Sequence, residues 1–124
     1  VFPKEYEGYS YVGNYGSIVG IYGKGNEYKL VIKGLGDATL KSNQKEAIDK
    51  IYKIVGNDGV GNVLSSLKDL DTDNLDKKDT KDTIDTIIKN SNISEDKKKE
   101  IEKIIFGENN KDNIFKDFTF NIKK

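Results

Sequence analysis

Apolar and polar residues alternate along residues 1–36 in the manner of β-strands. A period of two residues predicts half-buried strands. Glycine and asparagine tolerate a positive φ, so they indicate turns where they separate such strands. We therefore expect a three-stranded antiparallel meander with strands at residues 9–15, 18–22 and 28–33 and turns at residues 14–16 and 23–26.

Near residue 42 the hydrophobic period changes from 2 to 3.6, which predicts helices. Asn43, followed three residues later by Glu46, resembles a capping box, and Gly56 suits the end of a helix. Two helices are expected here, the first with its apolar stripe at Ala47, Ile48, Ile51, Tyr52 and Val55, the second at Val60, Val63, Leu64, Leu67 and Leu70.

Two more helices and a final strand follow in the expected order. A third helix has Ile84, Ile87 and Ile88 on one face, and a fourth, from an N-cap at Ser94 to Gly107, has Ile101, Ile104 and Ile105. Residues 113–124 alternate again. Segregated strands and helices favour the α+β class. We expect one α+β domain over residues 1–124, with four short helices packed as two αα-hairpins and a C-terminal strand that rejoins the sheet.

Composition excludes several chemistries. Of the 124 residues 34% are charged; the 21 basic residues, all lysines, balance 21 acidic ones, and Arg, His, Cys, Met and Trp are absent. The chain therefore forms no disulfide and contains no thiolate nucleophile or Ser-His-Asp triad. Zero net charge and the lack of arginine make nucleic acid an unfavoured partner. The many lysines, asparagines and isoleucines are typical of an AT-rich, bacterial genome.

No apolar run approaches the roughly 18 residues of a membrane span. The sequence starts at Val1 and contains no Met. A removed secretory signal and a trimmed chain both explain this start. We expect an extracellular or cell-surface protein, and a cytoplasmic location stays open.

An acidic run contains the weak metal-ligand candidates Asp69, Asp71 and Asp73. Their spacing resembles the first half of a calcium loop, but Asn74 replaces the glycine and Thr80 replaces the bidentate glutamate of that loop. A solvated helix terminus is the favoured interpretation. No metal or other cofactor is expected.

Two glycine pairs resemble phosphate-binding turns. Gly59 and Gly61 lie between two expected helices, as in a turn that holds a DNA phosphate, and Gly34 and Gly36 follow an expected strand. A tight αα turn and a plain loop are the favoured interpretations.

Six of the seven tyrosines lie within the first 28 residues. Tyrosine is enriched at protein interfaces and also packs in cores with its hydroxyl outward, so both interpretations stay open. Glu5 and Glu7 are the acidic residues in this segment; exposed strand charges are favoured over paired catalytic carboxylates. The expected partner-binding residues are Tyr6, Tyr9, Tyr11, Tyr15 and Tyr22.

These observations favour a non-enzymatic module that binds another protein, of the inhibitor or immunity type. The binding surface would be the tyrosine-rich sheet or the edge of its first strand. A carboxylate-only or divalent-ion-dependent enzyme is the main alternative. An intracellular domain that associates with nucleic acid is a lesser one.

Overall fold

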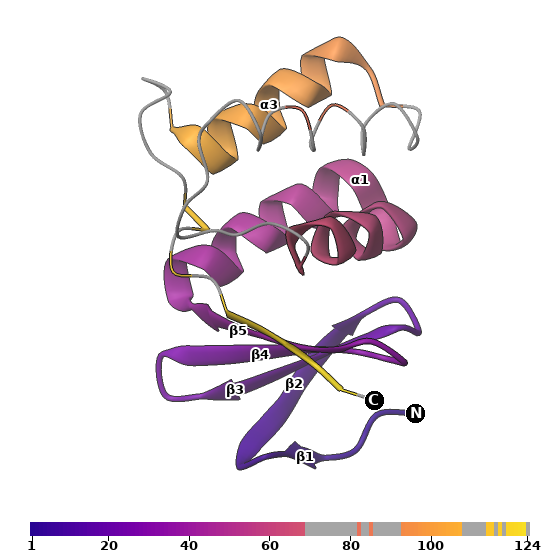
Figure 1. Ribbon diagram of the computed structural model, residues 1–124, viewed down its shortest axis with the longest axis vertical. Helices are drawn as coiled ribbons and strands as arrows, with labels where there is room; N and C mark the ends of the chain where they lie inside the picture. Colours follow the sequence, from indigo (N-terminus) through magenta and orange to yellow (C-terminus); the bar gives the residue numbers. More distant parts are fainter. Residues whose placement is uncertain are drawn as a thin grey trace. The chain divides into compact units, whose positions relative to one another are not determined.

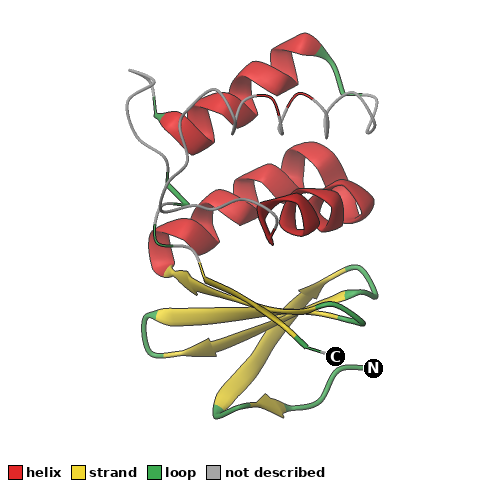
Figure 2. Ribbon diagram, in the orientation of Figure 1, coloured by secondary structure: helices red, strands yellow, loops and turns green. Residues whose placement is uncertain are grey.

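Six antiparallel strands form one sheet that curves as a half-barrel. Each strand pairs with the next one along the chain (Figure 1). Short turns join the first five strands (Figure 2). The strands are β1 (Glu5–Tyr6), β2 (Tyr9–Tyr15), β3 (Val19–Lys24), β4 (Glu27–Ile32), β5 (Gly36–Lys41) and β6 (Thr119–Ile122).

The structure is a computed structural model that describes residues 1–68, 82, 85, 93–107, 114–115, 117 and 119–123. The chain divides into two compact units. The sheet unit comprises Val1–Glu46 and Phe118–Lys124, and the helical unit comprises Ala47–Asp117.

The expected three-stranded meander is wrong, because the sheet has six strands. β2, β3 and β4 lie where strands were expected, whereas β1 and β5 were missed. β1 has only two residues, too few for a periodic pattern. In β5 the only large apolar residue is Leu40, and Asp37 is of a type depleted in strands. The C-terminal segment does join the sheet, since β6 pairs with β5.

The two faces of the sheet differ in chemistry. Residues directly opposite each other in neighbouring strands share a face. One such row is Ile21, Leu30 and Ala38, all buried. We call this side the aliphatic face; its buried aliphatic residues are Val19, Ile21, Leu30, Ile32, Ala38 and Leu40. The other side, here called the tyrosine face, has Tyr6, Tyr9, Tyr11 and Tyr22 from three strands.

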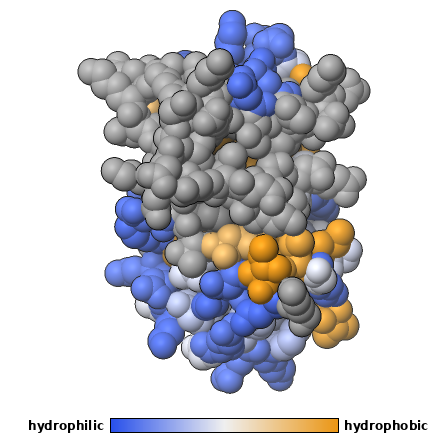
Figure 3. Space-filling model, viewed as in Figure 1, coloured by the Kyte–Doolittle hydropathy of each residue, from blue (hydrophilic) through white to orange (hydrophobic). Residues whose placement is uncertain are grey.

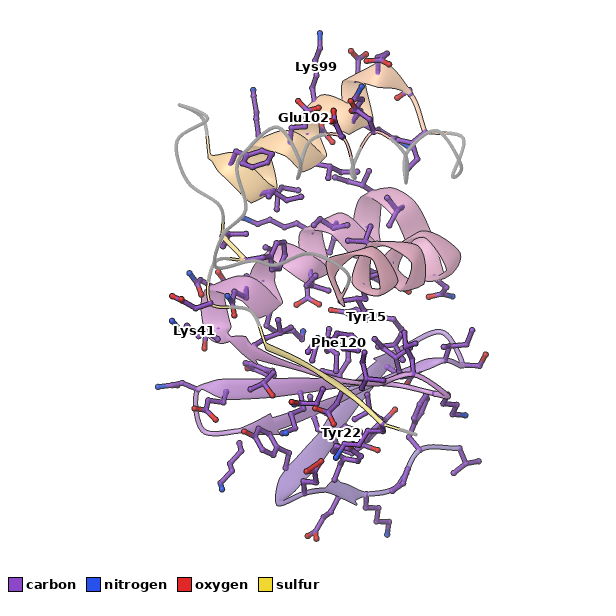
Figure 4. The ribbon with its side chains drawn as sticks, in the orientation of Figure 1. Tyr15, Tyr22, Lys41, Lys99, Glu102 and Phe120 are labelled. Carbon is purple, nitrogen blue, oxygen red and sulfur yellow. The ribbon has the colours of Figure 1, made fainter. Side chains whose placement is uncertain are left out.

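A β-bulge in β2 divides the tyrosines between the two faces. The register with β3 shifts between Tyr11 and Gly13, so Val12 is the extra residue. A bulge reverses the alternation beyond it, because one strand gains a residue that its partner lacks. Tyr15 therefore pairs with Val19 on the aliphatic face, and Figure 4 shows Tyr15 and Tyr22 on opposite sides of the sheet.

Helix α1 (Ser42–Lys68) occupies the region where two helices were expected. Gly56 departs from helical geometry, with a φ of 76°, and the helical conformation resumes at the next residue. An αα-hairpin needs a loop of two to five residues, so a break of one residue kinks the helix instead. The two expected hairpins are therefore wrong. Gly59 and Gly61 lie within α1 rather than in a turn.

The start of α1 uses a different cap from the expected one. The Lys41 N–H donates a 2.8 Å hydrogen bond to Oε1 of Gln44, which is buried. Gln44 is the third helical residue, so its side chain supplies the backward half of a capping box. Asn43 lies inside the first turn and is not the N-cap.

In the helical unit, the apolar stripes are found largely as expected. Ile48, Ile51, Val60 and Leu64 of α1 are fully buried. Helix α3 (Glu95–Phe106) begins at the N-cap Ser94, as predicted, and ends at Gly107, whose N–H donates to the Lys103 carbonyl. The expected third helix lies outside the described residues apart from Asp82 and Asp85, which are helical. A single domain over residues 1–124 stays a prediction.

Candidate functional site

A buried carboxylate on the tyrosine face connects both ends of the sheet unit. Asp37 of β5 has no exposed side-chain surface. Its Oδ2 accepts a 2.7 Å hydrogen bond from the Tyr6 hydroxyl, and its Oδ1 accepts a 3.0 Å bond from Nδ2 of Asn121. The ammonium groups of Lys29 and Lys123 lie 3.7 and 3.8 Å from the carboxylate oxygens. We call these five residues the Asp37 cluster.

Opposing effects determine the pKa of Asp37. Burial alone would raise it, because a charged carboxylate loses its hydration. The hydrogen bonds from Asn121 and Tyr6 and the charges of Lys29 and Lys123 outweigh burial, so the pKa lies below its ordinary value. Burial and then the hydrogen bond to Asp37 raise the pKa of Tyr6. Asp37 is therefore ionised and Tyr6 neutral at physiological pH.

This arrangement suits a structural role better than a catalytic one. A general base needs a pKa near the working pH and a free oxygen within reach of substrate. The Asp37 carboxylate is buried, its pKa is lowered, and both oxygens already accept hydrogen bonds. The cluster ties β1, through Tyr6, and β6, through Asn121, to Asp37 of β5. It thereby fixes where the N-terminal segment lies.

The first four residues cross the tyrosine face. The Pro3 carbonyl accepts a 2.7 Å hydrogen bond from the buried Tyr22 hydroxyl. The ring of Phe2 stacks on Tyr11 with centroids 6.2 Å apart. Gly20 permits this approach, because a Cβ there would lie 2.8 Å from Cδ1 of Phe2.

An open cavity of about 520 Å³ lies between this N-terminal segment and the β2–β3 hairpin. An aromatic pair, Phe2 and Tyr11, lines one part of it, and Asn14 is the principal polar side chain. The Asn14 amide is oriented by two hydrogen bonds, one from the Tyr11 hydroxyl and one to the Gly16 carbonyl. The remaining lining residues are Val1, Gly16 and Ser17.

The edge of β2 beside this cavity is open. β1 pairs only with Tyr9 and Ser10, and the last backbone bond on that side runs from the Tyr11 N–H to the Lys4 carbonyl. Among the described residues, no strand pairs with residues 12–14 on the side away from β3. A strand edge of this kind can accept an added strand from a partner.

Exposed apolar side chains gather in the same part of the sheet unit. Within the described residues, five large hydrophobic side chains are exposed; Val1, Tyr11, Val12 and Ile18 belong to the N-terminal segment or the β2–β3 hairpin, and the fifth is Ile122. Figure 3 shows apolar residues of the sheet unit grouped among polar ones. We call the β2 edge, the cavity and Tyr11 and Val12 together the β2 surface.

The tyrosines predicted to bind a partner have different environments. Tyr11 is 40% exposed and belongs to the β2 surface, whereas Tyr9, Tyr15 and Tyr22 are buried. The Tyr9 hydroxyl donates to Glu27, and Lys24 and Lys29 lie over its ring. Tyr6 is half-buried in the Asp37 cluster. The sheet thus brings Tyr6, Tyr9, Tyr11 and Tyr22 together and separates Tyr15 from them.

The acidic residues considered as catalytic or metal-binding candidates do not form a site in the described residues. Glu5 lies in β1, but Glu7 lies in the following turn at a φ of 47° and pairs with Lys123 at 3.2 Å. Asp69, Asp71 and Asp73 lie outside the described residues. In the part of the chain that the structure describes, no group of three acidic side chains could hold a metal ion.

Asp37 and Asn121 were not singled out from the sequence. The signal for them is weak, because polar residues in short strands usually face solvent. A clue was Asp37 itself, an acidic residue between the small residues Gly36 and Ala38.

Comparison with known proteins identifies no relative of this chain: no family model, curated protein or solved structure matches it. None of the helices over the described residues has the length and apolar character needed to cross a membrane.

Proposed function

We propose that this chain is a non-enzymatic module that binds another protein through the β2 surface, in the manner of an inhibitor or immunity protein. The observation that supports this proposal is the coincidence of three features in one place. An open strand edge, an aromatic-lined cavity and most of the exposed apolar side chains of the described residues all belong to the same part of the sheet unit.

Each feature suits protein recognition. An open edge offers backbone hydrogen bonds to an extended segment of a partner. Apolar side chains that are exposed in a group, rather than singly, tend to mark interaction sites. Tyr11 is a rigid aromatic anchor of the type enriched at binding hot spots, because Phe2, Tyr22 and Asn14 fix its ring.

The Asp37 cluster supports the same proposal indirectly. It ties both Tyr6 and Asn121 to β5, and β1 leads directly into β2. A partner would thus meet a preorganised surface, which lowers the entropic cost of binding.

Partner capture from the organism that makes this protein tests the proposal. The immobilised chain is incubated with secreted and cell-surface proteins, and bound proteins are identified by mass spectrometry. Val12 is 58% exposed, so Val12→Asp should leave the fold intact and abolish capture. Ile122, 64% exposed on β6, provides the matched control, and Ile122→Asp should retain capture.

Capture that survives Val12→Asp but is lost in Ile122→Asp would place the binding surface elsewhere and refute this version. A location outside the cell or at the cell surface is part of the proposal. Fractionation of the host cells tests it independently, and recovery of the protein only from the cytosol would contradict it.

A further inference from the structure

The sheet unit has a surplus of positive charge although the whole chain is neutral. Val1–Glu46 and Phe118–Lys124 contain eight lysines and five acidic residues, whereas the helical unit contains thirteen lysines and sixteen acidic residues. A surface of one sign attracts partners of the opposite sign and speeds their association.

Three of the five acidic side chains in the sheet unit already have partners. Asp37 is buried in its cluster, Glu7 pairs with Lys123, and Glu27 accepts the hydrogen bond from Tyr9. The ion pairs of Asp37 with Lys29 and Lys123, and of Glu7 with Lys123, use charges of both signs, so the sheet unit keeps its surplus of lysines over acidic residues.

The β2 surface itself has no acidic residue between positions 8 and 26. Lysines flank it instead. Lys33 is exposed, and its ammonium lies 4.5 Å from the centre of the ring of Phe2, a residue that lines the cavity. Lys4 is also exposed, and its carbonyl makes the last backbone bond before the open edge.

The edge and the cavity restrict the shape of the occupant. Residues 12–14 offer a strand edge, which an extended segment fits and a helix does not. Phe2 and Tyr11 provide an apolar wall for one side chain of that segment. Carboxylates beside that side chain would meet Lys33 and Lys4.

We propose that the occupant of the β2 surface is an extended acidic peptide segment of the partner, which adds a strand at the edge of β2 and places an apolar side chain in the cavity. This inference rests on the proposed function and specifies the chemistry of the partner.

Selection from a displayed library of random twelve-residue peptides on the immobilised full chain tests the inference. Peptides enriched on the wild type should contain an apolar residue flanked by Asp or Glu, with acidic residues several-fold more frequent than in the starting library. Lys33→Glu should weaken the best peptide about tenfold, because it reverses a charge beside the cavity. Binding of that peptide should also weaken as NaCl is raised.

The outcomes separate the two proposals. Enriched peptides without an excess of acidic residues would overturn the inference that the partner segment is acidic. The proposal that a protein binds at the β2 surface would still stand. Equal enrichment on the Val12→Asp variant would show that the peptides do not bind at the β2 surface, and would overturn both proposals. No enrichment on the wild type, together with a dimer that Val12→Asp dissociates in sedimentation, would make the occupant a second copy of this chain and overturn the inference.

Discussion

The Tyr6 hydroxyl donates a 2.7 Å hydrogen bond to the carboxylate of Asp37, across 31 residues of sequence and between two strands that do not pair with each other. Because Asn121 and Lys123 contact the same carboxylate, one buried charge joins the N-terminal and C-terminal strands of the sheet unit. The contact also anchors β1, which connects the N-terminal segment to β2.

We expect Tyr6→Phe to destabilise the protein. The substitution keeps the ring and removes a donor from a buried charged acceptor, which costs about 2 kcal/mol. Tyr11→Phe is the matched control; it removes a hydroxyl bonded to exposed Asn14 and should cost about 0.5 kcal/mol. Urea unfolding measures both free energies, and a Tyr6→Phe loss no larger than that of Tyr11→Phe would disprove a central role for this bond.

Stability should fall in acid because of Asp37. Its pKa in the folded protein lies below its ordinary value of 3.8. The unfolded chain therefore binds the proton more readily, and the stabilisation is fully present above pH 3.8 and lost as the pH falls through the folded pKa. Urea midpoints measured from pH 6 to pH 2 should drop less steeply in Asp37→Asn. Equal slopes for the two proteins would show that Asp37 does not govern acid stability.

Three tyrosines should resist ionisation in alkali. Burial chiefly raises the pKa of Tyr6 and of Tyr22, and the hydrogen bond to Glu27 chiefly raises that of Tyr9. A raised pKa adds stability below pH 10 that is lost as the pH rises through the folded value. Phenolate absorbance at 295 nm should therefore show at least three of the seven phenols ionising above pH 10 or only with unfolding. Simple titration of all seven near pH 10 would contradict this packing.

Gly36→Ala should disrupt the pairing of β5 and β6. A Cβ at Gly36 would lie within 2.0 Å of the Asn121 carbonyl oxygen, and its φ is 148°. Backbone must move to relieve this clash, so we expect a loss of about 3 kcal/mol. Gly34, with a φ of 77° and open space around it, is the control, and Gly34→Ala should cost about 1 kcal/mol. Thermal melts that rank the two variants in the opposite order would argue against the β5–β6 register.

Local patterns predicted those elements whose periodicity is long enough to recognise. β2 to β4, the stripe of α1 and the Ser94 cap follow directly from alternation, the 3.6 period and capping chemistry. β1 was missed because two residues cannot show a period, and β5 was missed because Leu40 is its only large apolar residue.

The candidate site was harder to predict, because it depends on contacts between strands that lie far apart in the sequence. Tyr9, Tyr11 and Tyr15 are spaced by even numbers of residues and would share one face of a regular strand, but the bulge at Val12 moves Tyr15 to the other face. Bulges depend on the pairing between strands, which a single chain segment does not reveal. Asp37 and Asn121 are 84 residues apart, and only the tertiary fold brings them together.

Amide hydrogen exchange, measured by mass spectrometry on the chain alone and saturated with its captured partner, tests the central claim most directly. We expect slower exchange at residues 11–16 on binding, because a partner segment pairs with the edge of β2, and unchanged exchange in β6. Protection confined to β6 or to the helical unit, with residues 11–16 unaffected, would contradict the claim.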